Sequence, residues 1–121
     1  MTIVVFFAVA LAGGVGAAMR YLLDAAVRRR TGEGFPWGIL VVNLSGALVL
    51  GILSPLPADE AWRWILGTGL LGGYTTFSAV AVTTALLAEE GRARASVTYA
   101  AASFAGSVVA AALGLSIGSA L

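Results

Sequence analysis

Polar residues inside long apolar stretches are the feature of this sequence that points to chemistry. Asn43 lies within an uncharged apolar stretch, where a carboxamide needs hydrogen-bond partners. It could bond to a neighbouring helix, or it could offer its N–H groups to an anion. Arg20 lies about one turn from the end of an earlier stretch. It could snorkel to the membrane surface or pair with Asp24, or it could be a cation at the mouth of an anion path.

The densest polar cluster covers residues 67–78, which read Gly-Thr-Gly-Leu-Leu-Gly-Gly-Tyr-Thr-Thr-Phe-Ser. Two adjacent glycines followed by Tyr-Thr-Thr propagate a helix poorly, so the cluster predicts a broken helix at membrane depth. A broken helix exposes backbone groups and survives only where it is buried in protein or lines a polar site. Freed carbonyls could hold a small hard cation such as Na⁺. The alternative is a close contact permitted by glycine, with threonines bonded to their own helix.

Three hydroxyls near the end of the chain share one helical face. Tyr99, Ser103 and Ser107 are four residues apart, so they form a slanted track along a helix. Such a track can replace water around a permeating ion by donating hydrogen bonds. Serine hydroxyls also commonly bond to their own helix, which would give the track no function.

The elements that must position these residues are set by composition. The chain has 121 residues, enough for one domain, and 60% of them are hydrophobic while 11% are charged. A soluble domain of this size could not hide so much apolar surface, so lipid must cover part of it. The net charge of +1 argues against a nucleic-acid partner. Because histidine and cysteine are both absent, the usual zinc sites and histidine-based catalysis are excluded.

Four stretches are apolar enough to cross a bilayer as helices, for which roughly 20 residues are needed. They are residues 3–23, 37–53, 64–87 and 97–121, and the second is rather short. Their continuous apolar character favours helices over a barrel. We therefore expect an all-α membrane protein, one domain over residues 1–121, with its third helix broken near the centre. The apolar start lacks a basic region, so we interpret it as a retained span and not a signal peptide.

Small residues repeat every four positions on two of these helices. They are Ala8, Ala12 and Gly16 on the first, and Gly106, Ala110, Gly114 and Gly118 on the fourth. Such stripes let helix backbones approach closely and indicate a tight, oligomeric bundle. The loops predict an orientation, because the first and third carry five arginines and the second carries one. We expect the arginine-rich loops in the cytoplasm and both termini outside.

The chain resembles the fluoride channels of the Fluc (CrcB) family over essentially its whole length. The matching stretches are Gly-Gly-Val-Gly-Ala-Ala-Met-Arg-Tyr at 13–21, Pro-Trp-Gly-Ile-Leu-Val-Val-Asn-Leu-Ser-Gly at 36–46 and Gly-Leu-Leu-Gly-Gly-Tyr-Thr-Thr-Phe-Ser at 69–78. The track of Tyr99, Ser103 and Ser107 matches as well. The third stretch is the most specific. The resemblance implies an antiparallel dimer of four-helix subunits in the cell membrane, with two narrow pores that let fluoride leave the cytoplasm passively.

The resemblance also implies roles for individual residues. A structural Na⁺ at the dimer centre would be held by the backbone carbonyls of Gly72 and Thr75. Phe77 would offer a ring edge to fluoride, since ring edges carry partial positive charge. The residues implied in the pore are Asn43, Phe77, Ser78, Tyr99, Ser103 and Ser107, with Arg20 in the vestibule.

One position departs from the family pattern. A second phenylalanine usually follows the first by three residues, but here that position holds Val80. Because each pore is thought to use aromatics from both subunits, we expect this chain to be one half of a heterodimer. The arginine bias supports the same hypothesis, since a subunit that inserts both ways should have balanced loops. The alternatives are a small multidrug-type exporter, which lacks its membrane carboxylate here, and a non-transporting assembly factor. An enzyme is the least favoured class, because no base or nucleophile constellation is present.

Overall fold

The structure is a computed structural model that describes residues 2–121, and most of these residues lie in helices. No strand occurs within those residues, so the expected all-α class is confirmed. In chain order the helices are α1 (Ile3–Thr31), α2 (Trp37–Leu53), α3 (Glu60–Arg63), the π-helix η1 (Trp64–Leu71), α4 (Gly72–Tyr74), α5 (Phe77–Glu89) and α6 (Ala93–Ala120).

The apolar helices agree with the expected spans in part. Three helical stretches are long and apolar enough to cross a membrane, at residues 3–31, 60–89 and 93–120. α2 is apolar but has only 17 residues, or about 25 Å at 1.5 Å per residue. This is slightly less than the ~30 Å hydrocarbon core of a bilayer. The described residues therefore contain three long apolar helical stretches and one shorter apolar helix, which is the pattern of a multi-pass membrane protein.

Local sequence sets the helix ends. The Thr2 hydroxyl accepts a hydrogen bond from the Val5 N–H at 3.2 Å, which caps α1. Gly32 follows α1 with a φ of 75°, a conformation that glycine adopts at little cost. Gly91 has a φ of 77° and turns the chain between α5 and α6. Pro36 stands immediately before α2, where its missing N–H is no loss.

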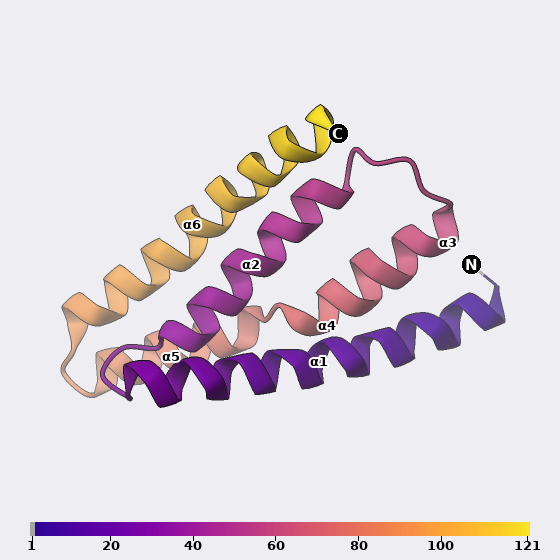
Figure 1. Ribbon diagram of the computed structural model, residues 1–121. Coiled ribbons are helices and arrows are strands. Elements are labelled where there is room, and N and C mark those ends of the chain that lie inside the picture. Colours follow the sequence, from indigo (N-terminus) through magenta and orange to yellow (C-terminus); the bar gives the residue numbers. More distant parts are fainter. Residues whose placement is uncertain (1) are drawn as a thin grey trace.

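The helices pack through their small residues. α2 and α6 lie side by side along most of their length (Figure 1). A Cβ added at Gly114 would overlap the Leu48 carbonyl oxygen, and one added at Gly118 would overlap the Ile52 carbonyl oxygen. The stripe on α6 thus permits the close backbone approach that its spacing predicts. On the other side of the molecule, Gly16 of α1 packs in the same way against η1.

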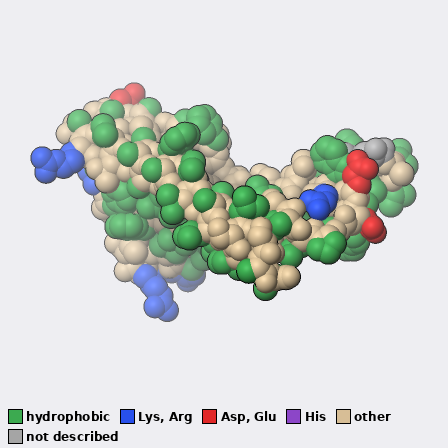
Figure 2. Space-filling model, turned by 90° about the horizontal axis from the view of Figure 1, so that it is seen from above, with side chains coloured by type: hydrophobic (Ala, Val, Ile, Leu, Met, Phe, Trp, Pro, Cys, Tyr) green, Lys and Arg blue, Asp and Glu red, His purple; other side chains and the backbone are tan. Residues whose placement is uncertain are grey.

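Apart from Arg20 in α1, the charged residues lie near the two ends of the molecule. The two termini and the α2–α3 connection share one end, while the α1–α2 and α5–α6 connections share the other (Figure 1). The five arginines of the first and third loops therefore belong to one end, and Arg63 to the opposite end. On the face shown in Figure 2, hydrophobic side chains cover the region between the charged ends. Many of them are exposed, as expected for a surface that meets lipid or another subunit.

Candidate functional site

The third span is broken at its centre, as the glycine and threonine cluster predicts. The π-helix η1 leads into α4, which ends at Tyr74. Thr75 and Thr76 then have extended backbones, with ψ values of 159° and 120°. α5 begins at Phe77, and the Thr76 hydroxyl caps it by accepting from the Ala79 N–H at 3.2 Å. π-Helical turns are rare and occur frequently at functional sites.

Asn43 of α2 holds this break through two hydrogen bonds to one residue. Its Nδ2 donates to the Thr76 carbonyl oxygen at 2.9 Å, and its Oδ1 accepts from the Thr76 N–H at 2.8 Å. The carboxamide thus replaces the helical partners that Thr76 lacks. Asn43 is 8% exposed. An amide carries two N–H donors, so one of them is left over for a ligand. Asn43 can therefore bond to a neighbouring segment and also offer an N–H to an anion, which were the two alternatives considered from the sequence.

Arg20 also reaches the break. Its Nε donates to the Gly73 carbonyl oxygen at 3.4 Å, a long hydrogen bond. The pairing of Arg20 with Asp24, considered from the sequence, is wrong, because Asp24 instead forms an ion pair with Arg28 at 2.9 Å. Two helices that pack beside the third span therefore each send a polar side chain to its broken backbone.

Two carbonyls at the break lose the donors that a continuous helix would give them. In an α-helix the N–H of Thr76 would bond to the Gly72 carbonyl, but here it donates to Asn43. The N–H of Ala79 would bond to the Thr75 carbonyl, but it donates to the Thr76 hydroxyl. Within residues 2–121 there is no cluster of His, Cys, Asp or Glu that could hold a metal ion. Backbone carbonyl oxygens are ligands that a hard cation prefers, and the Na⁺ implied for these two carbonyls stays a prediction.

A cavity of about 730 Å³ opens beside the break. Residues from α2, η1, α4, α5 and α6 line it, and apolar side chains dominate. The predicted site residues in its wall are Asn43, Gly72, Thr75, Phe77, Ser103 and Ser107, together with Val80. The structure thus brings most of the residues singled out from the sequence to one cavity.

Three predicted residues lie outside the cavity wall. Ser78 is beside the break, and its hydroxyl shares a 3.3 Å hydrogen bond with that of Thr76. Tyr99 is fully buried and packs with Leu40 and Leu87. Its hydroxyl is buried and has no hydrogen-bond partner among residues 2–121. Arg20 contacts the break from α1, as described above.

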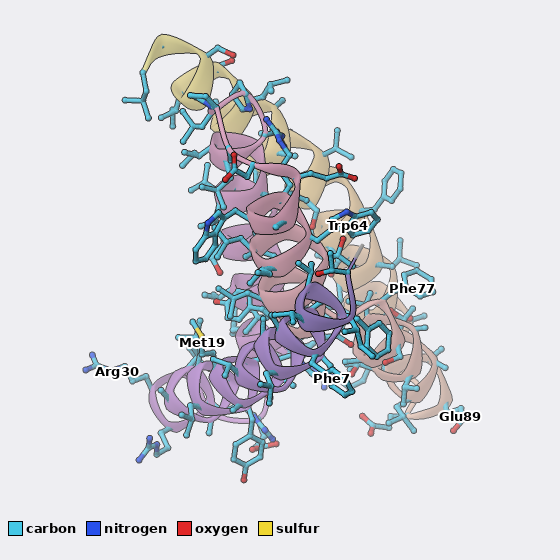
Figure 3. The ribbon with its side chains drawn as sticks, turned by 90° about the vertical axis from the view of Figure 1, so that its right-hand side faces the viewer. Phe7, Met19, Arg30, Trp64, Phe77 and Glu89 are labelled. Atoms are coloured by element: carbon cyan, nitrogen blue, oxygen red, sulfur yellow. The ribbon has the colours of Figure 1, made fainter. Side chains whose placement is uncertain are left out.

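The sequence reasoning missed two wall residues, Thr84 of α5 and Phe104 of α6. A signal for Thr84 exists, because residues 77, 80 and 84 share one helical face. Phe104 is 77% exposed and Phe77 is 83% exposed. Figure 3 shows Phe77 projecting outward from the start of α5. Both aromatic rings are therefore available to a neighbouring subunit or to lipid.

The fold and the break together define a multi-pass helical membrane protein with a polar site inside one of its spans. Residues 7–115 match the model of the family described as CrcB-like protein, Camphor Resistance (CrcB). The chain belongs to this family.

Curated relatives agree with the family match. The chain is 47% identical over 94 residues to "Fluoride-specific ion channel FluC 2" of Mycolicibacterium paratuberculosis, an alignment that covers 78% of this chain and 77% of that protein. It is 42% identical over 112 residues to "Fluoride-specific ion channel FluC" of Chelativorans sp., covering 88% and 90%. It is 40% identical over 122 residues to "Fluoride-specific ion channel FluC 1" of Leifsonia xyli, covering 98% and 89%. The family is thus one of ion channels and not of enzymes.

Proposed function

We propose that this chain is a subunit of a fluoride-selective channel of the cell membrane that lets fluoride leave the cytoplasm passively and so lowers its toxicity. The observation that carries the proposal is the broken third span, held by Asn43 beside a cavity that Phe77, Ser103 and Ser107 also line. Hydrogen fluoride crosses membranes as a neutral acid and ionises in a less acidic cytoplasm. A passive pore then lets the membrane potential expel the anion, so no energy-coupling site is required.

The residues at the cavity have the donors that a dehydrated anion needs. The second N–H of Asn43 supplies one hydrogen bond, the hydroxyls of Ser103 and Ser107 supply two more, and the Phe77 ring edge adds a weak attraction. None of these groups carries a full charge. Conduction requires binding strong enough for entry and weak enough for release, and neutral donors meet both conditions.

We further propose that two subunits pack antiparallel around this site. The exposed Phe77 and Phe104 rings and the open cavity of a single subunit support the pairing, because each would be covered by a partner. Because Val80 stands where the family usually has a second phenylalanine, a homodimer would lack part of the aromatic set of each pore. The favoured partner is therefore a second family member that keeps its own second phenylalanine. The arginine bias of five to one favours a single orientation and hence a partner of opposite bias. Relatives that carry the numbered names FluC 1 and FluC 2 fit such a pair.

The carbonyls of Gly72 and Thr75 would hold a structural Na⁺ between the two subunits. Each subunit would contribute two oxygens whose helical donors are diverted to Asn43 and Thr76. Such an ion would neutralise oxygen dipoles that face each other across the dimer and would fix the two breaks together. The ion is not transported, and the anion path runs through the side chains of the cavity.

The test is fluoride efflux from proteoliposomes, followed with a fluoride electrode and with chloride as the control anion. The chain is assayed alone and together with a family member of opposite loop bias. Fluoride-selective efflux in either preparation supports the channel. Efflux from the chain alone, at the selectivity of the pair, would count against the heterodimer. Absence of efflux in both preparations would refute the channel and favour an assembly factor.

A further inference from the structure

We propose that Thr84 of α5 contacts the permeating anion and determines how well the pore binds it. The inference rests on the proposed fluoride channel and extends it, because it adds a donor on α5 to the hydroxyl track of α6. Thr84 lies in the wall of the same cavity as Asn43 and Ser103. The sequence analysis did not single out this residue, and its role is argued from its contacts alone.

The Thr84 hydroxyl is buried and has no partner. Within residues 2–121, three buried side-chain oxygen or nitrogen atoms lack a hydrogen bond, and they are the hydroxyls of Thr84, Tyr99 and Ser103. Two of the three residues line the cavity. The unpaired hydroxyls are therefore concentrated where α5 and α6 meet, on the path proposed for fluoride.

The missing partner is notable because the hydroxyl is buried and cannot be solvated instead. Threonine normally satisfies its hydroxyl by donating to the carbonyl four residues earlier. In this chain Thr31 does so with Val27 at 3.0 Å, and Thr75 does so with Leu71 at 2.9 Å. Thr84 makes no such bond with Val80. A buried donor without an acceptor destabilises a fold, so structural stability does not explain this arrangement, whereas an anion that visits the cavity would.

Neighbouring residues fix Thr84 in this position. The buried Ser96 hydroxyl of α6 donates to the Thr84 carbonyl oxygen at 2.7 Å. This bond ties the start of α6 to α5 at the level of Thr84. Phe77 and Val80 occupy the same face of α5 and also line the cavity. Thr84 therefore continues the wall from the break toward the arginine-rich end of the molecule.

The chemistry follows from this placement. A rotation about the Cα–Cβ bond would turn the Thr84 hydroxyl toward the cavity, whose wall also contains Ser103, a residue with an unpaired hydroxyl of its own. Two neutral donors from adjacent helices then share one small anion and replace part of its hydration shell. Because no fixed charge is involved, the ion remains free to move on.

The experiment compares Thr84→Val, which keeps the shape and removes the hydroxyl, with Thr84→Ser, which keeps the hydroxyl. Thr98→Val is the matched control, because Thr98 is exposed on α6 and outside the cavity wall. Fluoride efflux is measured over a range of fluoride concentrations, in whichever preparation of wild-type chain conducts, alone or paired. The melting temperature of each variant in detergent is measured in parallel.

We expect Thr84→Val to lower fluoride flux about tenfold, equivalent to about 1.4 kcal/mol, and to raise the concentration for half-maximal flux. Thr84→Ser and Thr98→Val should resemble wild type, and all melting temperatures should agree. Wild-type flux and half-saturation in Thr84→Val would overturn the inference. Loss of flux in both Thr84 variants together with a lower melting temperature would overturn it as well, in favour of a packing role. A wild-type chain without flux in either preparation would instead refute the proposed function itself.

Discussion

Replacement of Asn43 by leucine tests the assignment of the carboxamide as the partner of the broken backbone. The change removes the 2.9 Å and 2.8 Å hydrogen bonds to Thr76 and leaves a partly buried N–H and a partly buried C=O without partners. Each unpaired buried group costs about 1–3 kcal/mol, whereas polar pairs in membrane proteins average nearer ~0.6 kcal/mol. We therefore take the lower end of the sum, about 2 kcal/mol, which is roughly a 30-fold shift in the unfolding equilibrium.

The assay has two parts. Thermal unfolding in detergent, monitored by size-exclusion chromatography, should give a lower midpoint temperature for Asn43→Leu than for the wild type. Fluoride efflux should fall at least tenfold, because both the break and one donor to the anion are lost. Asn43→Asp sharpens the result, since it keeps an acceptor for the Thr76 N–H but sets a second oxygen against the Thr76 carbonyl. We expect intermediate stability and no flux from this variant, because it also places a carboxylate in the anion path.

Ser45→Ala is the control for this experiment. It removes a 2.8 Å hydrogen bond to the Tyr74 hydroxyl on the same pair of helices but leaves the backbone of the break paired. We expect a loss of no more than about 1 kcal/mol and nearly unchanged flux. If Asn43→Leu unfolded at the wild-type temperature and conducted normally, the break would need no carboxamide, and the reasoning would be refuted.

Four further changes test the surroundings of the break. Gly73→Ala should destabilise the fold by about 1–3 kcal/mol, because the added Cβ overlaps the Gly13 carbonyl. Gly72→Ala should be tolerated, because its nearest neighbour would be 3.8 Å away, and the melting temperatures of the two variants decide the point. Val80→Phe should raise fluoride efflux by the chain alone severalfold, and an unchanged rate would count against the proposed aromatic deficit. Arg20→Gln should lower efflux more at low than at high ionic strength, since salt screens a cation near an anion path.

The helices were predictable because their signals are local. Continuous apolar sequence gave the helical class, and the Gly-Gly-Tyr-Thr-Thr sequence gave the break. The helix ends were less accurate, since hydropathy detects only the part of a helix that meets hydrocarbon. α1 continues to Thr31, well beyond the expected end at residue 23, and the Asp24–Arg28 pair at i,i+4 supports that extension. α3 likewise begins the third span at Glu60 and not at residue 64, because polar residues continue the helix past the apolar part.

The partners of the polar residues were not predictable, because they depend on how distant segments pack. Asn43 and Thr76 are 33 residues apart, and Arg20 and Gly73 are 53 apart. A local sequence pattern does not determine which of two acceptors an arginine contacts. Asp24 was therefore a reasonable prediction for the partner of Arg20, but it was wrong. Thr84 was missed for a related reason, since a helical threonine is expected to bond to its own helix.

The hydrogen bonds at the break also explain why some of its carbonyl oxygens have a hydrogen-bond donor and others lose theirs. Asn43 takes both backbone groups of Thr76, and Arg20 takes the Gly73 carbonyl. The Asn43 bond diverts the helical donor of Gly72, and the Thr76 hydroxyl diverts that of Thr75; these are the two carbonyls that the family resemblance implies for Na⁺. Occupancy of a cation site would therefore depend on Asn43, although its side chain is not itself a ligand. We expect Asn43→Leu to abolish any dependence of the melting temperature on Na⁺, because Thr76 would then be free to donate to Gly72. A dependence on Na⁺ that survives in this variant would mean that the carbonyls are held in place without the carboxamide.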